Sequence, residues 1–174
     1  MIRLKTPVSR EDIRALRVGE KVLLTGTVYT ARDQAHIRLQ HEKSLPFDLE
    51  GAAIYYVGPT PERPGFVIGS SGPTSAYRMD SLAIPLMERG VRIMIGKGDR
   101  SLTLIETLKK HDAVYLMATG GAGALLAACI KSKKVVLYED LGPEAVHALE
   151  VEDFPCYVAY DVHGGNIFKQ APSH

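Results

Sequence analysis

The stretch RIMIGKGDRSLTLIETLKKHDAVYLM, residues 92–117, decides the fold class. It contains two short apolar runs, over residues 92–95 and residues 113–117, of the length and composition typical of buried strands. Between them, residues 101–110 have the composition and apolar spacing of a helix. The stretch therefore predicts a strand–helix–strand unit with parallel strands and a right-handed crossover.

The same alternation of strands and helices extends along the rest of the chain. It predicts one α/β domain over residues 1–174, built on a mostly parallel central sheet. The part before the proline-rich loop fits the alternation least well, and we expect it to form a second sheet layer. The further strands are predicted at residues 21–30, 52–57, 66–69, 135–138 and 157–160, and the further helices at residues 9–19, 31–45, 74–89, 122–130 and 143–149.

Composition narrows the classes of function. A formal net charge of +1 gives no general attraction to nucleic acid or to a membrane surface. The sequence shows neither an apolar run of membrane-spanning length nor a secretory signal, so we expect a cytoplasmic protein.

Cys129 and Cys156 are too few to hold an iron–sulfur cluster, which needs three or four thiolates, and both are expected to be buried. The histidines lack the spacing of a metal site on one helix, so we predict no metal in this chain.

The loops that follow the predicted strands are the candidate ligand site. Ligands of open α/β sheets bind beyond the carboxyl ends of the strands, where several loops meet. These loops are rich in small residues that expose backbone N–H groups, and they lead into helix N-termini. They are residues 30–33, 70–75, 96–99 and 118–123.

Three cations are predicted at this same edge. Arg32 and Lys97 lie inside two of the loops, and Arg78 follows Thr74 by four residues, on the same face of the next helix. A cation at a helix N-terminus opposes the helix dipole, whereas an anionic ligand would bind both the cation and the backbone N–H groups. The pattern therefore indicates an anion-binding edge.

Structural alternatives to this interpretation stay open at the level of single residues. Arg32 can pair with Asp33 on the surface, and Arg78 can pair with Asp80 or Glu88. Lys97 can be a solvated turn residue, and the glycine pair at 120–121 can serve only a tight turn. A P-loop is excluded because no G-x-x-x-x-G-K-[ST] motif occurs, and the dinucleotide fingerprint is weak.

Four segments together resemble a known family. Residues 72–80, GPTSAYRMD, are similar to the G-P-T-T-x-x-R-M-D signature of class I (iron–sulfur) fumarate hydratases and L(+)-tartrate dehydratases, in the β subunit or C-terminal domain. Residues 30–36 (TARDQAH), 94–98 (MIGKG) and 119–123 (TGGAG) resemble further motifs of that family, in the same order. The resemblance implies a swivelling β/β/α domain of three layers.

The resemblance also implies an activity and its partners. The family's hydro-lyases add water reversibly to fumarate, giving malate, or dehydrate tartrate to oxaloacetate. A [4Fe-4S] cluster held by a partner α subunit would act as the Lewis acid, and this chain would bind no cofactor itself. The expected assembly is therefore a hetero-oligomer acting on a small dicarboxylate, and a chain that pairs with itself when isolated is expected to form a two-fold dimer.

Site residues follow from the matched motifs. Arg32, Thr74, Arg78 and Lys97 match substrate-binding positions, and Thr74 also matches a proton-transfer position. Ser75 and Tyr77 depart from the signature, and Tyr77 bears on the size of the substrate. The positions expected to support the site are Asp33, His36, Ser75, Thr119 and Gly120. The alternative is a stand-alone, non-catalytic module that binds a carboxylate or phosphate metabolite with the same cations.

Overall fold

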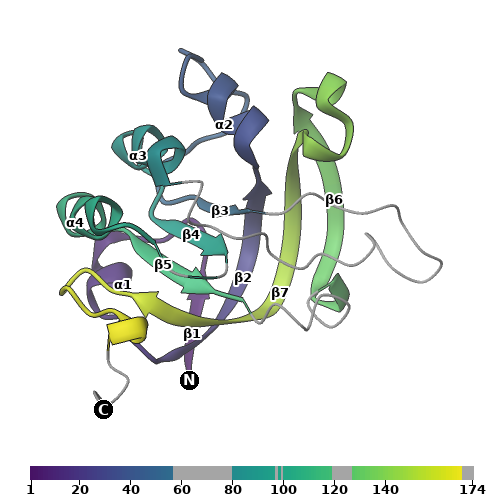
Figure 1. The fold of residues 1–174 in the computed structure, drawn as a ribbon. Helices are drawn as coiled ribbons and strands as arrows, with labels where there is room; N and C mark the ends of the chain where they lie inside the picture. The colour runs from purple at the N-terminus through teal and green to yellow at the C-terminus, as the bar shows by residue number, and fades with distance from the viewer. Residues whose placement is uncertain (57–79, 97, 99, 119–126, 170–174) are drawn as a thin grey trace.

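The computed structural model describes residues 1–56, 80–96, 98, 100–118 and 127–169, and Figure 1 shows their arrangement. Within these residues seven strands form one sheet, with helices packed against it. The strands are β1 (Ile2–Lys5), β2 (Lys21–Thr30), β3 (Ala53–Tyr55), β4 (Ile93–Gly96), β5 (Val114–Met117), β6 (Ile130–Leu137) and β7 (Val146–Tyr160). The helices are α1 (Arg10–Arg14), α2 (Asp33–Leu39), α3 (Asp80–Glu88) and α4 (Leu102–His111), with 3-10 turns η3 (Glu139–Glu144) and η4 (Ile167–Lys169).

The sheet closes on itself. Its strand order is β1-β2-β3-β4-β5-β7-β6, and an additional pairing between β2 and β7 joins β2, β3, β4, β5 and β7 into a ring of five strands. The pairings from β1 to β5 are parallel, whereas β7 runs antiparallel to β2, β5 and β6. The α/β class is thus confirmed, but the sheet is a mixed barrel rather than the mostly parallel sheet that we expected. The N-terminal strands belong to this same sheet and form no second layer.

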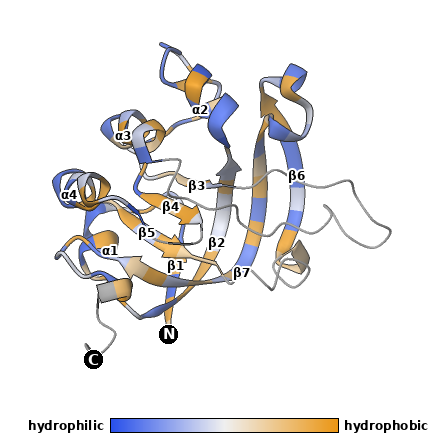
Figure 2. Ribbon diagram, viewed as in Figure 1, coloured by the Kyte–Doolittle hydropathy of each residue, from blue (hydrophilic) through white to orange (hydrophobic). Residues whose placement is uncertain are grey.

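Two apolar clusters lie on the two faces of the sheet. Along β4, Ile93 and Ile95 point into the barrel, and Met94 points outward to the helices. Because both faces are covered, β4 and β5 are apolar almost throughout, in contrast to the polar stretch of β6 (Figure 2). None of the helices in the described ranges is long and apolar enough to cross a membrane.

Several predicted elements are confirmed, because local chemistry specifies them. β2 has the predicted bounds, and its β-branched residues pair on both edges. Ser9 caps α1 in a reciprocal capping box with Asp12. Ser101 caps α4, whose main-chain N–H at Leu104 donates to the serine hydroxyl at 3.3 Å. The prediction for α2 was too long, since that helix ends at Leu39.

Two predictions near the C-terminus were wrong, whereas the strands predicted at residues 135–138 and 157–160 fall largely within β6 and β7. The helix predicted over residues 143–149 is instead η3 followed by the start of β7, which runs on to Tyr160. Pairing with β2 on one edge and β6 on the other outweighs the helix-like spacing of the apolar residues here. Ile130, predicted to end a helix, begins β6. The strand predicted at residues 66–69 and the start of the helix at 74–79 lie outside the described residues, as do residues 122–126.

Candidate anion-binding edge

The carboxyl ends of β2 and β4 lead directly toward the starts of α2 and α4, so the predicted site lies where two strands end and helices begin. Figure 1 shows α2, α3 and α4 following one another along one side of the sheet. Arg32 stands at this edge as the residue before α2, with an extended backbone and no side-chain capping bond. The main-chain N–H of Ala31 donates to Tyr55 at 3.1 Å, which holds the end of β2 against the end of β3.

His36 holds the main chain of Arg32. The carbonyl oxygen of Arg32 accepts the backbone N–H of His36 at 2.9 Å and lies 2.8 Å from the ring Nδ1. A carbonyl only accepts, so Nδ1 carries the proton, and Nε2 of the neutral ring carries the lone pair. Two orphaned polar atoms follow: Nε2 of His36 and Nε of Arg32 are buried without a hydrogen-bond partner among the described residues. Because buried polar groups are normally paired, these two atoms make this edge a candidate ligand site among the described residues.

Burial keeps His36 neutral. Its side chain is buried, and burial lowers its pKa to about 4. The bond to the Arg32 carbonyl and the Asp33 carboxylate oppose that shift, while the nearby Arg100 cation adds to it. The ring packs edge-on against Tyr56, with centroids 5.6 Å apart. His36 therefore acts as a neutral support at this edge near pH 7.

A buried cation, Arg100, lies close to His36 and was missed in the sequence. Its Nε donates to the Asp80 carboxylate, and its guanidinium carbon lies 4.8 Å from the Tyr115 ring centroid and 5.1 Å from that of Tyr56. Two faint signals were present in the sequence: Asp80 closes the segment GPTSAYRMD, and Arg100 directly follows the predicted loop at residues 96–99. The Asp80 carboxylate binds Arg100 and accepts the backbone N–H of Ser101. Arg78, considered above as a partner for Asp80, lies outside the described residues.

The structure brings three of the predicted site residues together: Arg32, Asp33 and His36 lie at the start of α2. The described neighbours of the other loops lie at the same edge. The Tyr115 hydroxyl donates to the Gly98 carbonyl at 3.0 Å, and the Ala118 N–H donates to the Gly96 carbonyl at 3.1 Å. The other predicted site residues, Thr74, Ser75, Arg78, Lys97, Thr119 and Gly120, lie outside the described residues.

The cysteines of this chain do not fit an iron–sulfur cluster. The sequence has only two, and a cluster needs three or four thiolates. Cys156 lies in the barrel core, where burial raises the pKa of its thiol, and Cys129 is half-buried just before β6. In the described part of the chain, no group of three His, Cys, Asp or Glu side chains could hold a metal ion.

Comparison with known proteins decides the family. Residues 1–171 match the family model described as "Fumarase C-terminus". The chain belongs to this family. Among curated relatives, it is 40% identical over 159 residues to "Fumarate hydratase class I, aerobic" of Escherichia coli K12, and the match covers 88% of this chain but 29% of that protein.

A second kind of family member has a length close to that of this chain. "L(+)-tartrate dehydratase subunit beta" of Escherichia coli K12 is 34% identical over 173 residues, with 96% of this chain and 86% of the relative covered. "Fumarate hydratase 2" of Leishmania major is 37% identical over 175 residues, with 96% of this chain but 31% of the relative covered. The family that the four motifs predicted is confirmed.

Proposed function

We propose that this chain is the β-type subunit of a hydro-lyase that adds water reversibly to fumarate or removes it from a hydroxy-dicarboxylate such as tartrate. Membership of the Fumarase C-terminus family supports this activity class, and the match to "L(+)-tartrate dehydratase subunit beta" over 86% of that relative supports the separate-subunit form. The observation that carries the proposal is the buried Nε of Arg32, a donor at the edge where strands end that has no hydrogen-bond partner in the described part of the chain.

Arg32 is assigned to a substrate carboxylate. A guanidinium presents several N–H donors to a carboxylate, and charge-assisted bonds of this kind are among the stronger ones in proteins. His36 supports it by fixing the Arg32 carbonyl, and the neutral ring adds no competing positive charge. In the same proposal, Arg78 and Lys97 bind the carboxylates of the dicarboxylate substrate together with Arg32.

Thr74 is the proposed proton-transfer residue. A threonine hydroxyl is a poor base unless a neighbour relays its proton, and Asp33, His36 or a group of the partner is proposed for that relay. The glycine-rich turn at Thr119 and Gly120 would contribute backbone N–H groups to the anion.

The partner is proposed to be an α subunit that holds a [4Fe-4S] cluster, because the two cysteines here cannot do so. When bound there, the cluster would supply Lewis-acid polarisation of the substrate oxygen atoms. Assembly of this chain with that partner as a hetero-oligomer belongs to the same proposal. So does a cytoplasmic location, because free thiols and a cluster suit a reducing compartment.

The test is anaerobic co-expression with the cluster-bearing partner, followed by assays of fumarate hydration and tartrate dehydration. Arg32→Ala is expected to lower kcat/KM by about 10- to 100-fold, the loss expected for one hydrogen bond to a charged group. Arg38→Ala is the matched control, because Arg38 lies in α2, the helix that Arg32 precedes, but pairs at the surface with Asp140 at 2.7 Å. An Arg32→Ala complex with wild-type kinetics would remove Arg32 from the site.

The stand-alone anion-binding module is the competing function. The orphaned donor of Arg32 suits it equally, since any carboxylate or phosphate could accept that bond. The two functions differ in what the isolated chain does. Calorimetric binding of fumarate, tartrate or phosphate by this chain alone, together with no activity in any complex, would favour the module.

A further inference from the structure

Two contacts fix the imidazole ring of His36 at the carboxyl edge of the sheet. Its Nδ1–H donates to the carbonyl of Arg32, one helical turn earlier, at 2.8 Å. Its ring packs edge-on against Tyr56, which directly follows β3. The residue is only 1% exposed. Because the ring is held in this way, the lone pair of Nε2 has a fixed direction, on the side of the ring away from the Arg32 carbonyl.

Nε2 of His36 can accept a hydrogen bond but cannot donate one. The neutral imidazole carries one proton, and the Arg32 carbonyl, which only accepts, requires that proton on Nδ1. Burial lowers the pKa of His36 to about 4, so the ring takes up no second proton near pH 7. No group in the described part of the chain donates to Nε2. A buried acceptor of this kind requires a donor from a ligand or from solvent.

Arg32 presents the complementary group on the same turn. Its Nε–H is a donor that is also buried and has no acceptor among the residues that the structure describes. A carboxylate can accept from Arg32, but it has no hydrogen to donate to His36. A single ligand that satisfies both atoms must therefore combine a carboxylate with a hydroxyl. An α-hydroxy carboxylate carries these two groups on adjacent carbon atoms, which suits two side chains that lie one helical turn apart.

We propose that His36 is a specificity-determining residue, whose Nε2 accepts a hydrogen bond from the hydroxyl of a hydroxy-dicarboxylate while Nε–H of Arg32 binds the adjacent carboxylate. The inference rests on the proposed function above and deepens it, because it assigns recognition of the hydroxylated substrate, such as malate or tartrate, to a residue of this chain. Fumarate has no hydroxyl, so it gains only the bond to Arg32. A ligand that lacks the hydroxyl leaves a buried acceptor unpaired, which is the physical basis of the discrimination.

Two substitutions separate the acceptor of His36 from its support of Arg32. In His36→Asn, the amide can still donate to the Arg32 carbonyl, but the shorter side chain places no acceptor at the position of Nε2. In His36→Gln, the longer side chain can place an acceptor near that position, but it gives up the bond to the Arg32 carbonyl. The asparagine variant therefore tests the hydroxyl contact alone.

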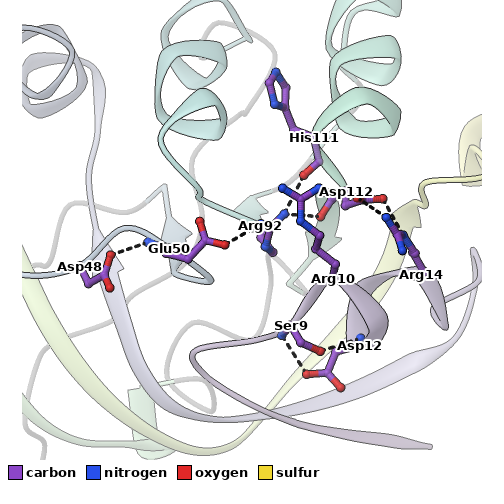
Figure 3. A network of polar contacts seen from close by, with 9 residues as sticks. All are labelled: Ser9, Arg10, Asp12, Arg14, Asp48, Glu50, Arg92, His111 and Asp112. Atoms are coloured by element: carbon purple, nitrogen blue, oxygen red, sulfur yellow. Dashed lines mark hydrogen bonds and ion pairs between the residues drawn. The ribbon is translucent and has the colours of Figure 1, made fainter.

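His111 provides a control histidine away from the proposed site. It is the last residue of α4 and precedes β5, so it lies at the amino edge of the sheet. Its carbonyl accepts a hydrogen bond from Arg92 at 2.8 Å, and Figure 3 shows its ring pointing away from that network. His111→Asn therefore makes the same chemical change as His36→Asn without altering the carboxyl edge.

The experiment uses the complex assembled with the cluster-bearing partner and two ligands that differ only in the hydroxyl, malate and succinate. KM for malate and tartrate and the competitive inhibition constant of succinate are measured at neutral pH for the wild type and the three variants. We expect His36→Asn to raise both KM values by about 3- to 10-fold, the range for one neutral hydrogen bond, and to change succinate inhibition by less than about twofold. His36→Gln should keep part of the preference for malate over succinate, and His111→Asn should keep all of it.

Three results from an active complex would overturn this inference alone. Equal changes for malate and succinate in His36→Asn would mean that His36 acts only through Arg32. Unchanged constants for both ligands would assign the Nε2 lone pair to solvent. If His36→Asn does not assemble, the wild type decides, because a wild-type complex that binds succinate as tightly as malate makes no use of the hydroxyl. A wild-type complex that is inactive on every dicarboxylate would instead refute the proposed function, and this inference with it.

Discussion

Acidification should destabilise the folded chain through His36. Its pKa is lowered by burial from 6.5 to about 4, with Arg100 adding to the shift and Asp33 opposing it. As the pH falls below 6.5, the unfolded chain therefore binds a proton that the native chain does not. The stability that this residue contributes is fully present above pH 6.5 and is lost as the pH falls toward 4.

The size of the effect follows from the shift. Each pKa unit corresponds to about 1.4 kcal/mol, so a shift of about 2.5 units gives a limiting loss of about 3 kcal/mol. Between about pH 7.5 and about pH 5, the same two pKa values give a loss of about 2 kcal/mol. A loss of this size is a large fraction of the stability of a typical domain.

The assay is urea unfolding at both pH values for the wild type and for His36→Asn. Asparagine cannot take up the proton, and its amide can still donate to the Arg32 carbonyl. The stability that the His36→Asn variant loses on acidification should therefore be smaller than that of the wild type by about 2 kcal/mol. His41→Asn is the control, because His41 is exposed in the turn after α2, and it should keep the wild-type dependence. Equal losses in the wild type and His36→Asn would refute the reasoning.

Two further predictions concern local backbone structure. Gly26→Ala should cost about 3 kcal/mol or more, because φ is +119° and the new Cβ would lie 2.4 Å from a threonine hydroxyl oxygen. Gly19→Ala is the control: its φ is +88°, but nothing lies within 4 Å of the new Cβ, so a loss of about 1 kcal/mol of stability is expected. Both losses are measured by thermal unfolding. Ser9→Ala should cost about 1 kcal/mol by removing the cap of α1, and Ser9→Asp should keep most of that stability. A Ser9→Asp variant no more stable than Ser9→Ala would contradict the capping argument.

The sequence predicted best the elements that depend on local chemistry. The β-branched residues of β2 gave that strand its bounds, and the serines before α1 and α4 stand where those helices begin. Arg32 could be placed at the site edge for the same reason, since it lies directly after a well-predicted strand. These features involve residues within a few positions of one another, so a linear pattern is sufficient to find them.

The first half of β7 could not be predicted in this way. Residues 143–149 have a spacing that suits a helix as well as a strand, and only the edges of β2 and β6 decide for β7. The Asp80–Arg100 pair was missed for a related reason. Two charges twenty residues apart look like ordinary surface groups until the barrel buries them beside Tyr56 and Tyr115.

The sequence by itself determined the α/β class and the family, and it placed Arg32 between β2 and α2, because short-range patterns and motifs carry that information. Only the tertiary structure decided that the sheet closes. β7 is long enough to pair with β2 along one edge, while β6 and β5 share its other edge in succession. Such closure depends on pairing between distant segments, and no single stretch of the chain determines the free energy of that pairing.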